Sequence, residues 1–225
     1  MKSLGQYESH AQSQFHKRNV EIYKETQKVW TDRPVVFMSI YEHNSNVLPW
    51  REAGALVELV PLDREGQLDF QGLERLLKKY KGHNSLKVAT LSAGSNITGT
   101  LVDVDRAAVL CHKYGTLAIF DYAAVSPYTE INMKDVTPSL SSNHGFPQVP
   151  AADAGLAYKD AVFFSPHKLV GGPGSSGVLL AKKNILYSKK PARSGGGIVF
   201  FVDELSHEYV SNVEELEESG TPGII

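Results

Sequence analysis

The 225-residue sequence is poor in cysteine and has no long apolar runs. Its single cysteine, Cys111, excludes an internal disulfide and is typical of a reducing compartment. No apolar run approaches the roughly 20 residues that a membrane-spanning helix needs. Residues 1–10 lack the apolar core of a signal peptide. These absences predict a cytoplasmic protein with no membrane partner.

Strong charge and metal-binding motifs are missing as well. The net charge is -2, and acidic and basic residues are interspersed, which argues against a nucleic-acid partner. The eight histidines are scattered, with no H-E-x-x-H and no cysteine partner, so no metal site is expected. No serine or cysteine nucleophile with an obvious base stands out. With 42% hydrophobic residues, the chain is suited to one ordinary globular core.

What the sequence does contain is an alternation of apolar strand-like runs and amphipathic helices. The pattern predicts strands at 35–40, 55–62, 87–92, 117–120, 161–164 and 178–181, and helices at about 70–80 and 104–114. Such alternation indicates the α/β class, with a mainly parallel sheet flanked by helices. We expect residues 1–32 to form a polar N-terminal segment, helical over about 13–29, and residues 33–225 to form the domain.

Two segments fall outside this alternation. Residues 137–153 hold three prolines and little apolar mass, which predicts a long mobile insertion. Residues 195–201 place a glycine run before two aromatic residues, a composition that suits a contact between two subunits.

A single lysine, Lys168, follows the strand at 161–164 and precedes a glycine-rich stretch, Gly171 to Gly177. Glycines around a lone amine predict a place where some group approaches the backbone closely. The alternative is a solvated surface lysine. The stretch also matches G-x-G-x-x-G, but a β-favouring run at 178–181 follows instead of a helix, so we discard a dinucleotide site.

Other polar residues leave the predicted strands at the same edge of the sheet. In parallel sheets, ligands bind beyond the carboxyl ends of the strands. Taken singly, each of these residues has a simpler explanation: His43 as a turn residue, Asp121 as a cap, and Asn96 as an Asx turn. Their joint placement favours a shared site. The candidate set is His43, Asn96, Asp121, Ser165, His167 and Lys168.

This set suits pyridoxal phosphate chemistry. A lysine forms a Schiff base with an aldehyde, and an aspartate keeps a pyridine nitrogen protonated. Lys168 and Asp121 are therefore the expected pair. Ser165 and His167 would hydrogen-bond the phosphate, and His43 would stack on the ring.

Five motifs in this order resemble the class V aminotransferases, the group that includes the cysteine desulfurases. Within the group, the stretches at 120–124 and 165–174 are most similar to a branch known only as aminotransferase-like. The resemblance runs from about residue 33 to the C-terminus. The motifs are Glu42-His-Asn-Ser-Asn-Val-Leu-Pro-Trp50, Ser95-Asn-Ile-Thr-Gly99, Asp121-Tyr-Ala-Ala124, Ser165-Pro-His-Lys168 and Gly220-Thr-Pro222.

The resemblance implies the large domain of a fold-type I enzyme that depends on pyridoxal 5'-phosphate. It implies Lys168 as the Schiff-base lysine, Asp121 against the pyridine nitrogen, and His43 on the ring. It places Asn96 near the phenolic oxygen or the substrate carboxylate. Family members are homodimers, and Thr221 would reach the phosphate of the neighbouring subunit.

The sequence also departs from the family pattern. Desulfurases usually have a glutamine where this chain has Ala124, and their nucleophilic cysteine lies well beyond the last motif. Cys111 lies within a predicted helix and cannot be its counterpart, so desulfuration is disfavoured for this polypeptide. Residues 1–34 contain only Gly5 and no phosphate loop, and no small C-terminal domain follows residue 225. The expectation is a fold incomplete at both ends.

The predicted function is that of a class V aminotransferase or lyase acting on a small amino acid, with Lys168 holding the cofactor and moving the α-proton. The alternative is a truncated or degenerate paralogue with little or no catalysis, which acts as the partner of a full-length subunit.

Overall fold

The computed structural model describes residues 33–134, 145–186, 190–191 and 194–218. The expected helix at 13–29 and the N-terminal segment lie outside these residues. The strands are β1 (Val35–Ser39), β2 (Leu56–Val60), β3 (Lys87–Ser92), β4 (Leu117–Asp121), β5 (Ala161–Phe164), β6 (Val178–Ala181), β7 (Val199–Val202) and β8 (His207–Tyr209). The α-helices are α2 (Asn44–Glu52), α3 (Phe70–Lys79), α4 (Val104–Lys113) and α5 (Val213–Glu218).

Six strands form one sheet in the order β2-β1-β3-β4-β5-β6. The first five are parallel, and β6 pairs with β5 in the antiparallel sense. All six strands expected from the apolar runs are present, and so is the mainly parallel α/β fold. The central strand β1 is buried along its whole length, as a strand covered on both faces must be.

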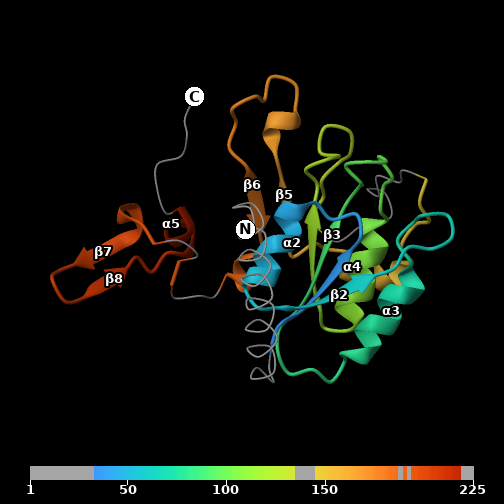
Figure 1. Ribbon diagram of the computed structural model, residues 1–225, viewed down its shortest axis with the longest axis horizontal. Helices are drawn as coiled ribbons and strands as arrows, with labels where there is room; N and C mark the ends of the chain where they lie inside the picture. Colours follow the sequence, from blue (N-terminus) through green and yellow to red (C-terminus); the bar gives the residue numbers. More distant parts are fainter. Residues whose placement is uncertain (1–32, 135–144, 187–189, 192–193, 219–225) are drawn as a thin grey trace, which may run out of the picture.

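Helices cover both faces of the sheet (Figure 1). On one face, α3 and α4 pack their apolar sides against Phe37, Leu91 and Phe120. On the other face, α2 supplies Val47 and Trp50, which pack on Val36, Met38 and Val88. The predicted helix ends are also found, since Asp103 Oδ1 accepts from Arg106 N (3.0 Å) at the start of α4, and Gly115 ends it with φ +62°.

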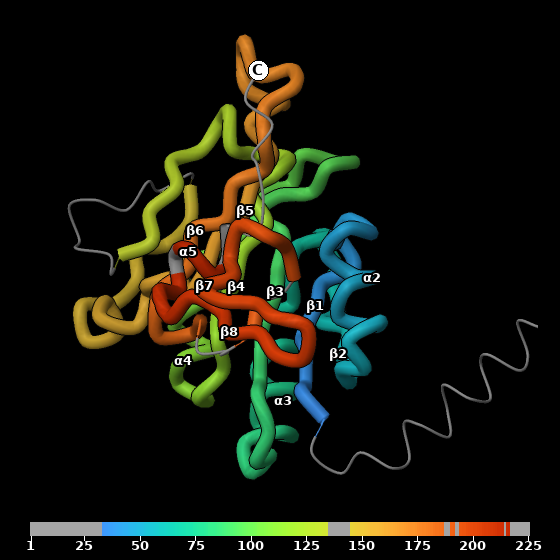
Figure 2. Tube along the Cα trace, turned by 90° about the vertical axis from the view of Figure 1, so that its left-hand side faces the viewer, coloured from blue at the N-terminus to red at the C-terminus, as the bar shows by residue number. Residues whose placement is uncertain are grey.

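Two features were not predicted from the sequence. The polar stretch after β1 forms the helix α2, which is weakly amphipathic and carries Pro49 in its interior. Near the C-terminus, β7 and β8 form a hairpin next to α5, and it stands away from the six-stranded sheet (Figure 1). Seen from that side, the hairpin lies in front of the sheet (Figure 2). None of the helices in the described part of the chain is long and apolar enough to cross a membrane.

The segment expected as an insertion is described only from residue 145 onward. Its described part leads into a 3-10 helix, η1 (Ala151–Leu156), that lies against α4. Val149 and Leu156 pack on Val109, and Lys113 pairs with Asp153 at 2.7 Å. This part of the segment therefore covers the outer side of α4.

A buried contact between His112 and Asp160 joins α4 to the amino end of β5. The Nε2 atom of His112 lies 2.9 Å from Asp160 Oδ2, which also accepts from Ala118 N at 2.8 Å. The Nδ1 atom of His112 faces Leu156 O at 2.7 Å, so both ring nitrogens meet oxygen acceptors. Burial alone raises the pKa of Asp160, but the bonds from His112 and Ala118 outweigh it and lower the pKa.

We predict that Asp160→Asn lowers the free energy of unfolding by about 1–2 kcal/mol at pH 7, because two charge-assisted hydrogen bonds become neutral ones. A carboxylate with a lowered pKa stabilises the fold above its unfolded-state pKa of about 3.9. The difference between wild type and variant should therefore begin to shrink as the pH falls below about 4, and it should disappear once the pH is below the lowered folded-state pKa of Asp160. Urea unfolding at neutral pH and at low pH measures both.

Asp153→Asn is the matched control, because its partner Lys113 is half-exposed. It should change the stability by no more than about 0.5 kcal/mol. Equal losses in the two variants would contradict the special role of the buried pair.

Candidate active site

The carboxyl ends of the parallel strands bring distant polar residues to one edge of the sheet. The register pairs Ser92 with Asp121 and Asp121 with Phe163. The backbone ladder continues past the strands, with Ala93 N donating to Asp121 O and Tyr122 N donating to Phe163 O, both at 2.8 Å. Asp121 is thus fixed between the ends of β3 and β5.

A cavity of about 370 Å³ lies at this edge, a volume typical of a small-molecule site. Six of the seven candidate residues from the sequence line it, and the seventh, Thr221, lies outside the described residues. Sequence reasoning did not predict the other five residues as part of the lining: Ser45, Ser92, Gly94, Ala123 and Ala124. The lining is His43, Ser45, Ser92, Gly94, Asn96, Asp121, Ala123, Ala124, Ser165, His167 and Lys168.

Asp121 is the buried anion of this cavity, with only 5% of its surface exposed. Burial raises the pKa of its carboxyl, while the hydrogen bond from Ala123 N (2.8 Å) and the charges of Lys168 and His43 lower it, and the net direction is upward. A cationic group bound beside Asp121 would offset this cost of burial. The cavity is therefore prepared for a ligand with a protonated nitrogen.

His43 is held at the rim as the N-cap of α2. Its Nδ1 accepts from Ser45 N at 3.3 Å and lies 2.8 Å from Ser45 Oγ. An acceptor at Nδ1 places the proton of the neutral ring on Nε2. The residue is exposed and lines the cavity, so a planar ligand can lie against its ring.

Lys168 lies in a short 3-10 turn, η2 (Pro166–Lys168), that follows β5, and the loop up to β6 folds back on it. Gly172 approaches this turn so closely that a Cβ atom there would lie 1.9 Å from Pro166 O. Gly171 and Gly174 have φ of +79° and +85°. Gly172 thus permits a close approach between two stretches of backbone, whereas the approach of a ligand to the glycines stays a prediction.

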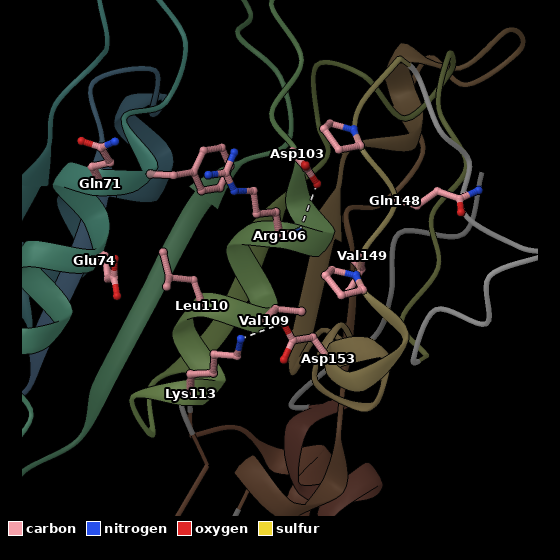
Figure 3. A pocket seen from close by; sticks show the side chains of 13 residues that line it. Gln71, Glu74, Asp103, Arg106, Val109, Leu110, Lys113, Gln148, Val149 and Asp153 are labelled. Atoms are coloured by element: carbon pink, nitrogen blue, oxygen red, sulfur yellow. Dashed lines mark hydrogen bonds and ion pairs between the residues drawn. The ribbon is translucent and has the colours of Figure 1, made fainter.

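A second hollow, of about 440 Å³, lies between α3, α4 and residues 147–153 (Figure 3). Its charged side chains already have partners within the protein. Lys113 pairs with Asp153, Asp103 caps α4, and the Arg106 guanidinium lies 4.2 Å from the centre of the Phe70 ring. The hollow is therefore explained by the packing of residues 147–153 against α4, and it needs no ligand.

Two negative findings narrow the chemistry of the described residues. No three His, Cys, Asp or Glu side chains within them gather as metal ligands would. Cys111 is fully buried in α4, and burial raises the pKa of its thiol to about 12. A thiol in this state is not a nucleophile.

The residues around the cavity fit pyridoxal phosphate. They provide an amine for the aldehyde, a buried carboxylate for the ring nitrogen, an imidazole for the ring face, and hydroxyl and imidazole groups for the phosphate. The volume is also sufficient for a ligand of this size.

Comparison with known proteins identifies the relatives of this chain. The sequence profile of the family Aminotransferase class-V matches residues 19–144. A probable cysteine desulfurase from Chlamydia muridarum is 31% identical over 201 residues, which cover 87% of this chain and 43% of the relative. A probable cysteine desulfurase from Pyrococcus abyssi is 28% identical, with 82% and 40% covered.

Solved structures agree with this assignment. The cysteine desulfurase CsdA from Escherichia coli superposes with a TM-score of 0.63 at 26% identity, covering 88% of this chain and 44% of that one. A cysteine desulfurase from Thermococcus onnurineus, at 22% identity and a TM-score of 0.63, shares the fold. The chain spans about two-fifths of the length of the curated relatives it matches.

We predict that Gly172→Ala displaces the lysine turn, because its Cβ atom collides with Pro166 O. The expected cost is about 1–3 kcal/mol of unfolding free energy, as in other overpacked sites, measured by thermal and urea unfolding.

Gly177→Ala is the matched control, since a Cβ at position 177 meets nothing within 4 Å. It should leave the stability nearly unchanged. If Gly172→Ala is as stable as this control, the loop does not depend on the close approach.

Proposed function

Because this chain belongs to the class V aminotransferase family, whose members depend on pyridoxal phosphate, we propose that it is the cofactor-holding part of an aminotransferase or lyase for a small amino acid. The observation that supports this most directly is the single cavity shared by Lys168, Asp121 and His43. The proposal concerns the whole protein's activity as well as this chain.

Six residues of the cavity have a proposed task. Lys168 binds the cofactor covalently as its Schiff-base lysine, and Asp121 keeps the pyridine nitrogen protonated. His43 covers the ring face. Ser165 and His167 donate to the phosphate, and Asn96 orients the phenolic oxygen or the substrate carboxylate. Thr221 is proposed to reach a neighbouring subunit's phosphate.

The bound cofactor would supply an electron sink for charge that develops at the α-carbon of the substrate. Lys168, as a free amine in the cavity, would be the base that moves the α-proton of a bound substrate. Asp121, which lines the same cavity, would be the anion that holds a protonated ring nitrogen. The fold would thus hold the amine of Lys168 and the carboxylate of Asp121 in position before the substrate binds.

The volume of the cavity and the relatives both support a small amino acid as the substrate. A space of about 370 Å³ that also holds the cofactor leaves room for a small side chain. The relatives named above are cysteine desulfurases. Sulfur transfer through Cys111 is not part of the proposal, because this thiol is buried and remains protonated at neutral pH.

Adding pyridoxal phosphate to the purified chain should produce the visible absorption band of a lysine-bound cofactor. Borohydride reduction followed by peptide mass spectrometry should place the added mass on Lys168. Lys168→Ala should lose the band and the modified peptide, because no other amine of the described residues lines the cavity.

Lys81→Ala is the control, since it removes a lysine just after the end of α3, outside the cavity lining. A band that persists in Lys168→Ala would contradict the assignment. Turnover of amino acids by the chain alone would exclude the alternative of an inactive partner subunit, which predicts weak or no cofactor binding and no turnover.

We further propose a cytoplasmic homodimer that uses the β7–β8 hairpin as part of its interface. The hairpin exposes Phe200, Phe201, Val202 and Leu205, with exposed fractions of 51–97%. Exposed apolar side chains in such number mark an interaction surface.

Light scattering should give the mass of two chains for the wild type. The double variant Phe200→Ser with Phe201→Ser should give the mass of one chain. A monomeric wild type would contradict this assembly.

A further inference from the structure

The ladder between β1 and β3 ends before the strands do. Its last pair is Phe37 with Ala89, although β1 continues to Ser39 and β3 to Ser92. Beyond that pair, β1 is joined only to β2, and β3 only to β4. The two strands therefore part at their carboxyl ends, where the chain order of the sheet reverses and ligands of α/β proteins bind.

Side chains take over where the backbone ladder stops. Glu42 Oε1 accepts from Ser92 N at 2.8 Å, a strand N–H that a neighbouring carbonyl would otherwise satisfy. Its Oε2 accepts from Ser92 Oγ at 2.9 Å and from Asn46 Nδ2 at 2.7 Å. Ser39 Oγ donates to Oε1 at 2.6 Å. One carboxylate thus receives four hydrogen bonds from β1, α2 and β3.

A second bond extends the same bridge toward the centre of the sheet. The buried Asn46 accepts from Thr90 Oγ1 at 2.9 Å through its Oδ1. The Glu42 carboxylate can only accept, so the Nδ2 of Asn46 must face it, and the Oδ1 of Asn46 is left to accept from the Thr90 hydroxyl. A chain of hydrogen bonds therefore connects β3 to the start of α2, through Thr90, Asn46, Glu42 and Ser92. The donor and the acceptor of each bond in this chain are defined.

We propose that Glu42 is a positioning residue: its carboxylate clamps the start of α2 to the end of β3 and so holds His43 and Ser92 at the cavity. The next residue in the chain is His43, and Asn46 N donates to His43 O at 2.8 Å. His43 is thus joined to Glu42 by a peptide bond, and Ser92 is joined to it by hydrogen bonds. The role toward the cofactor rests on the proposed function.

The energetics agree with a positional role. Burial raises the pKa of Glu42, and the four hydrogen bonds lower it only in part, so the net direction is upward. Within the described residues, no cation forms an ion pair with Glu42. The Glu42 carboxylate therefore costs folding free energy. Its role is to hold the start of α2 against the end of β3.

The donor pattern permits a swap experiment. In Glu42→Gln, an amide NH₂ at the place of Oε2 would face Asn46 Nδ2, a donor against a donor, and relief requires the Asn46 amide to flip and the Thr90 hydroxyl to turn from donor to acceptor. The double variant Glu42→Gln with Asn46→Asp restores the match. The carboxylate introduced at position 46 would accept from the amide introduced at position 42 and from Thr90 Oγ1. The negative charge moves from position 42 to position 46, and every donor in the chain of hydrogen bonds still meets an acceptor.

The primary readout is the His43 ring signal of the cofactor-free protein, observed by NMR with ¹³C-labelled histidine and assigned with His43→Gln. Glu42→Gln should shift or broaden this signal, and the double variant should bring it back. Thr90→Val removes only the hydrogen bond from Thr90 to Asn46, so it should give a smaller shift of the His43 signal. This variant takes the place of Glu42→Gln if Glu42→Gln fails to fold.

Asp160→Asn is the matched control, because it alters a buried carboxylate at the opposite end of the sheet. It should lower stability without moving the His43 signal. A His43 signal unchanged in Glu42→Gln, or unrestored in the double variant, would overturn the proposal.

The second readout is the dissociation constant of pyridoxal phosphate, which should rise at least about tenfold in Glu42→Gln (about 1.4 kcal/mol) and recover in the double variant. If wild type gives no cofactor band while the His43 signal responds as described, the proposed function fails and the clamp stands. If the band is present and Glu42→Gln binds like wild type, the clamp fails and the proposed function stands.

Discussion

The backbone ladder across β3, β4 and β5 is the constraint on which the cavity depends. It aligns Ser92, Asp121 and Phe163 in one row and continues for one residue beyond the strands. Because the strands are parallel, every connection from this row leaves at the same edge. Asp121 and Lys168, which are far apart in the sequence, therefore face a common space without needing a direct bond to each other.

Much of this arrangement could be predicted from the sequence, because each central strand is a short apolar run that ends in a polar residue. Asp121 and Lys168 follow such runs, and the parallel sheet places them together. The helix α2 could not be predicted, since its polar sequence with Pro49 gives no helical periodicity. The bonds from Glu42 to Ser92 could not be predicted either, because they join residues 50 positions apart and arise only where β1 and β3 separate.

The same edge carries two carboxyl groups, Asp121 and Glu42, and burial raises the pKa of both. Elsewhere in the sheet, Asp160 has a lowered pKa because His112 and a backbone N–H stabilise its charge. The contrast separates two uses of a buried acid. At the amino end of β5 the charge stabilises the fold, whereas at the carboxyl ends it is kept for geometry or for a ligand, at the expense of stability.

The burial of Cys111 has a practical meaning. It is the chain's single thiol, and its position inside α4 together with a pKa of about 12 makes it inert to alkylating reagents. A cysteine introduced at the rim of the cavity or on the β7–β8 hairpin would react alone. Fluorescent or spin labels can thus report distances within this protein without first replacing the native residue.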